Sequence, residues 1–330
     1  MAQQPAPLQQ TTPLPPLSKT QPFSDQPEKE KGSGLIRLLV VILVILGIVI
    51  AVLLYFLYQG RQTQNQNAPQ ATVTPTTMVS PGEQSSVEIT TDDEFRYITG
   101  NGLPDHETGQ FPNVGNPNTI SVQDYNFRVT LNPEKADVVT EVSLGIFGVA
   151  VNGVPFDPGT DEWYNDDQNS GWQYDALSGA IDLGLDENNA HVQPSGAYHY
   201  HGLPTALIAE QTGGEHSTLI GWAADGFPIY ALYGYTDKDD DSSGIKELQS
   251  GYQLKSGERE SGPGGVHDGT FNEDWEFKPG TGDLDRCNGR NGVTPDYPDG
   301  TYAYFITSEY PFIPRCWRGT PDNSFLQGDQ

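Results

Sequence analysis

Two of the six histidines of this chain lie two residues apart, in the sequence Tyr198-His199-Tyr200-His201. Successive side chains of an extended strand point to opposite faces, so His199 and His201 share one face and the two tyrosines share the other. Neutral imidazole is the commonest metal ligand among protein side chains. The motif therefore predicts half of a metal site, and imidazole donors fit copper or zinc better than magnesium or calcium.

The remaining ligands of such a site must come from other segments. His191 lies just upstream in a turn-rich segment, and His216 precedes a run that is typical of a strand. We expect His199, His201 and His191 to bind the metal, with His216 as a further ligand. Asp225 is expected to bind the metal or to orient one of its ligands, although an Asp-Gly turn explains this residue equally well. His106 and His267 are interpreted as exposed loop residues.

A later segment of the chain repeats the motif without its histidines. The segment 186–201 leads an Asp-x-x-Asn turn into Gly-x-Tyr-x-Tyr, and the segment 285–305 repeats this order. The tyrosines recur in both copies, as a buried face requires, whereas Ala303 and Phe305 take the two histidine positions. This pattern indicates a duplicated scaffold with a site on one half only, so the tyrosines are interpreted as core residues.

Residues 140–320 resemble the YHYH domain family, a group of extracytoplasmic proteins without an established activity. The resemblance rests on matching stretches of sequence at 151–156, 182–186, 191–196, 198–202, 216–217, 221–230 and 282–290, and on Cys316. The chain departs from the family pattern at 186–191, where many relatives read like Asp-x-Cys-x-Gly-His. Any role of a cysteine at that point is absent here.

The first third of the chain does not have the composition of a globular domain. Residues 1–34 are rich in Gln, Pro and Ser and predict a disordered cytoplasmic tail. Residues 38–58 are 21 uncharged, mostly aliphatic residues, so we expect a transmembrane helix over 35–58. Lys29, Lys31 and Arg37 precede it and predict a cytoplasmic N-terminus. A cleaved signal peptide is the alternative, but its apolar region would be shorter.

A flexible linker over 59–89 and an extracytoplasmic domain over 90–330 complete the prediction of a single-pass protein of the cell membrane. The 37 glycines and 26 prolines punctuate short runs rich in Val, Ile, Tyr and Phe. These runs predict a mainly β domain, sandwich-like or an irregular double sheet. Residues 205–211 are expected to form one short helix.

Charge and cysteine content add two constraints. The net charge of −27 disfavours nucleic acid as a partner and is compatible with a cation ligand. The two cysteines, Cys287 and Cys316, predict a disulfide in an oxidising compartment, with two buried free thiols as the alternative. No Gly-x-Ser-x-Gly elbow is present, so a Ser/His/Asp triad cannot be argued, and the catalytic residues stay unknown.

An acidic run offers a second candidate cation site. Asp237, Asp239 and Asp241 begin like a calcium loop, but Ser242 and Leu248 stand where an EF-hand requires Gly and Glu. A looser calcium loop and a solvated hairpin tip both remain as interpretations.

Three functions are compatible with these patterns. The first is a membrane-anchored domain that binds copper or zinc through imidazoles. The second is a structural or adhesive β module whose histidines bond within the core. The third is a zinc-dependent hydrolase or hydratase, in which an open position on the metal carries water.

Overall fold

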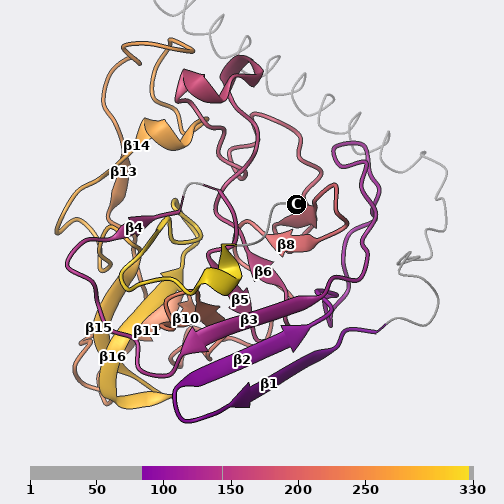
Figure 1. Cartoon of the computed structure of the whole chain (residues 1–330). Coiled ribbons are helices and arrows are strands. Elements are labelled where there is room, and N and C mark those ends of the chain that lie inside the picture. The colour runs from indigo at the N-terminus through magenta and orange to yellow at the C-terminus, as the bar shows by residue number, and fades with distance from the viewer. Residues whose placement is uncertain (1–83, 143, 327–330) are drawn as a thin grey trace, which may run out of the picture. The chain divides into compact units, whose positions relative to one another are not determined.

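The computed structural model describes residues 84–142 and 144–326 (Figure 1). The predicted cytoplasmic tail, the predicted transmembrane helix and most of the predicted linker lie outside the described residues. In the described part, no helix has the length and apolar character needed to cross a membrane. The first strand begins at Val87, so the domain boundary expected at residue 90 falls inside it.

The prediction of a mainly β domain is confirmed. One mixed sheet has eight strands, in the spatial order β15 (Gly289–Thr294), β16 (Tyr297–Ile306), β10 (Pro228–Ala231), β9 (Gly221–Ala223), β5 (Gly148–Ala150), β6 (Pro155–Phe156), β8 (Tyr198–Tyr200) and β7 (Ala190–Val192). Figure 1 shows β15 and β16 on one side of the domain and β8 on the other. A three-stranded antiparallel sheet is formed by β1 (Val87–Thr91), β2 (Phe95–Gly100) and β3 (Tyr125–Thr130).

The remaining elements are short. Three antiparallel pairs join β11 (Tyr233–Tyr235) to β12 (Ile245–Glu247), β13 (Tyr252–Leu254) to β14 (Trp275–Phe277), and β17 (Cys316–Trp317) to β4 (Thr140–Glu141). The helical elements among the described residues are 3₁₀ turns: η1 (Tyr164–Asp166), η2 (Gln168–Ser170), η3 (Asn272–Asp274) and η4 (Asn323–Phe325). The helix expected at 205–211 is wrong, because this segment forms hydrogen-bonded turns instead.

The eight-stranded sheet consists of two four-stranded halves with the same pairing pattern. In the first half, β5 and β6 form a hairpin, β6 runs parallel to β8, and β8 is antiparallel to β7. The second half consists of β9, β10, β16 and β15, which repeat these relations in the same order. The two halves meet where β5 pairs with β9. The echo seen in the sequence thus extends to two further strands in each half.

The turns of the two halves have the same backbone conformation. The β5–β6 and β9–β10 hairpins each turn through four residues, and the third of these is a glycine, Gly153 or Gly226, with φ of 82° and 90°. Glycine is required there because other residues adopt positive φ only at a steric cost. Asn189 and Asn288 both have φ of 52° in the Asp-x-x-Asn turns, since Asn tolerates this conformation better than most residues.

The tyrosines of the two echoed segments form the centre of the core, as predicted. Tyr198, Tyr200 and Tyr304 are fully buried and Tyr302 nearly so. Each turn aspartate accepts a hydrogen bond from the first tyrosine of its own half. Tyr198 Oη donates to Asp186 over 2.7 Å, and Tyr302 Oη donates to Asp285 over 2.9 Å. The tyrosines therefore tie each turn to the strand that follows it.

The predicted disulfide is confirmed. Cys287 and Cys316 are bonded, both are buried, and their Cα atoms lie 5.1 Å apart. The bond joins the turn before β15 to β17. The alternative of two free thiols is therefore wrong.

Replacing both cysteines with serine is expected to lower the free energy of unfolding by about 3 to 4 kcal/mol, because the bond closes a loop of about 30 residues in the unfolded chain. Urea denaturation without reductant measures this difference. The wild-type protein in reductant is the control and should approach the variant. Equal stability of variant and wild type would contradict the prediction.

Candidate metal centre

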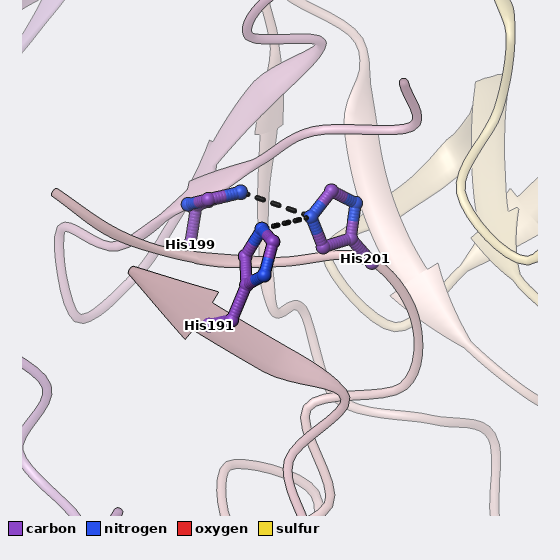
Figure 2. Close-up of side chains that lie close together, drawn as sticks. All are labelled: His191, His199 and His201. Atoms are coloured by element: carbon purple, nitrogen blue, oxygen red, sulfur yellow. Dashed lines mark hydrogen bonds between the residues drawn. The ribbon is translucent and has the colours of Figure 1, made fainter. Parts of the chain in front are cut away.

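Three histidine side chains converge at the outer edge of the first half of the sheet (Figure 2). His191 in β7 lies directly opposite His199 in β8, and His201 follows the end of β8. The Nε2 atom of His201 lies 2.9 Å from Nε2 of His199 and 3.0 Å from Nε2 of His191. Among the residues that the structure describes, these three are the group of His, Cys, Asp or Glu side chains close enough together to hold one metal ion.

The spacing of the three nitrogen atoms is close to that of a metal site. A zinc–nitrogen bond of 2.0–2.1 Å places two nitrogens of a tetrahedral centre about 3.3 Å apart. The observed separations of 2.9 and 3.0 Å are a few tenths of an ångström shorter. Small rotations of the rings would therefore accommodate an ion between them.

Backbone carbonyl groups fix the tautomers of two of these rings. His191 Nδ1 lies 2.9 Å from the carbonyl oxygen of Leu183, and His199 Nδ1 lies 3.1 Å from that of Ala197. A carbonyl oxygen only accepts, so both Nδ1 atoms carry the proton. In the neutral rings both Nε2 atoms then direct a lone pair toward the centre. This arrangement, with the far nitrogen bonded to a carbonyl, is the usual support of metal-binding histidines.

The third ring cannot satisfy both of its neighbours by hydrogen bonding. His201 Nε2 carries at most one proton, so it donates to His191 or to His199 but not to both. Its Nδ1 atom forms no hydrogen bond of good geometry. Burial lowers the pKa of His201, and a contact with the backbone of Asp157 partly offsets this effect. At least one lone pair at the centre therefore has no hydrogen-bond donor, and a cation between the rings would bind it.

Burial keeps the three imidazoles neutral. His199 and His201 are 3% and 4% exposed, and His191 is partly exposed. Burial, with a smaller effect of His191, lowers the pKa of His199 to about 3. Burial also lowers the pKa of His201 and of His191. Metal ions bind the deprotonated ring nitrogen, so near neutral pH the cluster need not lose a net proton, because a proton on Nε2 of His201 can move to its Nδ1.

The structure does not bring His216 into this cluster. The ring of His216 packs against Tyr230, Tyr235 and Phe305, with centroids 5.1, 4.8 and 6.0 Å away, and its Nδ1 lies 2.8 Å from the carbonyl oxygen of Ser217. Phe305 occupies in the second half the position of His201 in the first. His216 thus lies beside the histidine-free counterpart of the site.

Asp225 also belongs to the second half, in the β9–β10 turn. Its Oδ2 atom accepts hydrogen bonds from Tyr304 Oη at 2.6 Å and from the Gly319 amide at 2.8 Å. Asn152 holds the equivalent turn position of the first half and contacts the equivalent tyrosine, but with the opposite direction of donation, because Nδ2 of Asn152 donates to Oη of Tyr200 over 3.0 Å. Burial raises the pKa of Asp225 to about 6, against the opposing effect of these hydrogen bonds. Its observed contacts give it a role in connecting the hairpin to the core.

This raised pKa predicts a pH dependence of stability. Because the folded protein holds the Asp225 proton more tightly than the unfolded chain, the carboxyl group stabilises the fold below pH 4, and this contribution is lost as the pH rises through 6. The change amounts to about 3 kcal/mol, at about 1.4 kcal/mol per pKa unit. Relative to Asp225→Asn, which does not titrate, the wild type should lose that stability between pH 4 and pH 7.

Urea denaturation of both proteins at several pH values, with a chelator present, measures this change. Any constant effect of the substituted hydrogen bonds cancels in the comparison of slopes. Parallel pH profiles of the two proteins would contradict the assignment.

In the described part of the chain, the side chains of the acidic run do not converge on one point. Asp237, Asp239 and Asp241 are exposed and are not among the side chains that converge on one point. The Asp239 amide donates to Asp237 Oδ1 over 3.1 Å, as in a polar turn. This observation favours the solvated tip over the looser calcium loop.

Sequence reasoning missed the role of His106 and the carbonyl groups that orient the cluster. His106 is half-buried rather than exposed, and its Nε2 lies 2.6 Å from Oη of Tyr200. His267 is partly exposed and lies apart from the cluster, with its Nδ1 3.1 Å from the Gly257 carbonyl. The oxygens of Leu183 and Ala197 carry no side-chain signal, so the sequence could not reveal them.

Comparison with known proteins gives one match. The model of the family described as YHYH protein matches residues 126–319, a span that contains the three clustered histidines and both cysteines. No curated protein matches the chain, and no solved structure matches it. The match supports the resemblance seen in the sequence and names no activity.

Proposed function

Because the chain belongs to the YHYH protein family, and because three imidazoles converge within it, we propose that its β domain binds one copper or zinc ion through His191, His199 and His201. The observation that carries the proposal is the convergence of the three Nε2 atoms, with two of the rings oriented by carbonyl groups. Three neutral nitrogen donors without a carboxylate favour copper or zinc over magnesium or calcium.

Metal analysis of the purified full-length chain tests this proposal. The protein is stripped with a chelator, incubated with a small excess of copper or zinc, and freed of unbound ions. We expect one tightly held ion per chain. His267→Ala is the matched control, because it removes a histidine outside the cluster and should keep the ion. A chain that retains no copper or zinc would favour the alternative of a structural or adhesive module.

We further propose that this domain faces the outside of the cell on a single membrane anchor. The uncharged stretch 38–58 and the basic residues before it support the anchor, and the disulfide between Cys287 and Cys316 supports an oxidising compartment. A metal site held outside the cytoplasm would meet extracellular rather than buffered cytoplasmic ions.

The predicted topology gives a further expected result. Protease added to intact cells should remove the domain and leave the N-terminal tail protected, because the basic flank of the anchor remains in the cytoplasm. Immunoblotting with tags at the two ends measures this. A protected C-terminal tag together with a cleaved N-terminal tag would reverse the orientation.

A further inference from the structure

The three histidines do not complete a closed coordination shell. Structural zinc sites take four protein ligands, whereas sites that act on substrates have three and leave one position open. Within the described residues, the group that can hold an ion contains three side chains. Both cysteines are bonded to each other. His216 and Asp225, the other ligands expected from the sequence, lie in the second half of the sheet.

Asp186, the acidic residue nearest to His191 in its electrostatic effect, forms its hydrogen bonds with other groups. Asp186 raises the pKa of His191 against the larger effect of burial. Its Oδ2 atom accepts from Tyr198 Oη at 2.7 Å and from the Gly109 amide at 3.0 Å, and Oδ1 accepts from the amides of Asn188 and Ala190. Turning this carboxylate toward the metal would break the turn that positions β7.

Of the three rings, His191 is the one nearest to solvent. His199 and His201 are buried, while His191 is partly exposed on β7, the last strand of the sheet. The three Nε2 atoms approach one another from the two neighbouring segments β7 and 199–201 (Figure 2). Solvent therefore lies nearest to a bound ion on the side of His191, at the edge of the sheet.

From this we infer that the metal keeps an open coordination position, which takes water, hydroxide or a small anion from solvent. The inference rests on the proposed function. Three neutral imidazoles leave the full charge of a divalent ion uncompensated, which favours an anionic ligand and lowers the pKa of a bound water. A metal that exchanges small ligands differs in function from a structural metal, which only stabilises the fold.

The test uses cobalt(II), which has visible absorption bands and is bound by the same donors as zinc. The full-length chain is loaded with one cobalt ion and titrated with sodium azide, with sodium chloride at equal ionic strength as the salt control. We expect a saturable change in the cobalt bands, identical in His267→Ala. Copper(II)-loaded protein should in addition accelerate the relaxation of water protons, because a coordinated water exchanges with solvent.

Three results overturn the inference in different ways. Cobalt or copper that binds at one ion per chain, without an azide response and without water relaxation, would show a closed coordination shell and leave the metal-binding proposal standing. Failure to bind any of the three metals would remove both. Release of cobalt by azide, detected by ultrafiltration, would also contradict the inference, because the anion would then compete for the ion instead of completing its shell.

Discussion

Replacing His199 with alanine is expected to abolish tight metal binding while the domain remains folded. His199 supplies one of three donor nitrogens, and loss of even a residue that supports a ligand commonly costs 10- to 100-fold in metal affinity. We therefore expect the loss for His199→Ala to exceed about 100-fold. The fold should survive, because Ala303 occupies the equivalent position of β16 in the second half, where it is 2% exposed in a smaller hydrophobic cluster of that half.

Competition with a chromogenic chelator measures the affinity, and circular dichroism follows the fold. His267→Ala serves as the control and should bind as the wild type does. An unchanged affinity of His199→Ala would place the metal elsewhere.

Replacing Tyr200 with alanine is expected to lower the free energy of unfolding by about 3 to 5 kcal/mol, the usual range for a large buried aromatic residue. The ring is fully buried and lies 5.5 Å from Phe156 between centroids. Its hydroxyl group connects His106 Nε2 at 2.6 Å with Asn152 Nδ2 at 3.0 Å. The substitution therefore leaves a cavity and removes the partner of the buried Asn152 amide and of the half-buried His106 ring.

Urea denaturation in the presence of a chelator measures this loss without a contribution from metal binding. Tyr200→Phe is the matched control, because it keeps the ring and loses only the hydrogen bonds, at about 1 to 3 kcal/mol. Tyr304→Ala in the second half should resemble Tyr200→Ala. A Tyr200→Ala protein as stable as the wild type would contradict the assignment of the tyrosines to the core.

Local patterns predicted the mainly β class, the buried tyrosines and the disulfide. They succeeded because strand alternation and the presence of only two cysteines constrain the result without knowledge of distant contacts. His191 was also predicted as a partner of the His-x-His pair, since it precedes the strand by a short turn. The pairing of His191 with His199 across β7 and β8 is a local hairpin relation of this kind.

The misplaced residues depend on contacts between distant segments. His216 and Asp225 lie close to the motif in sequence, but β9 and β10 belong to the other half of the sheet and bring them beside Phe305 and Tyr304. His106 is nearly a hundred residues from Tyr200, and the loop that carries it has no strand pattern. Sequence distance alone does not indicate which half of a duplicated sheet a residue joins.

X-ray absorption at the metal edge of the loaded full-length chain tests the central claim most directly, because it counts the imidazole rings bound to the ion. The account predicts three imidazole nitrogens at 2.0–2.1 Å, the usual zinc–histidine distance, and one further nitrogen or oxygen ligand that is not an imidazole. In His199→Ala protein loaded at high metal concentration the imidazole count should fall to two. A spectrum of the wild type dominated by oxygen ligands, with fewer than three imidazoles, would contradict the account.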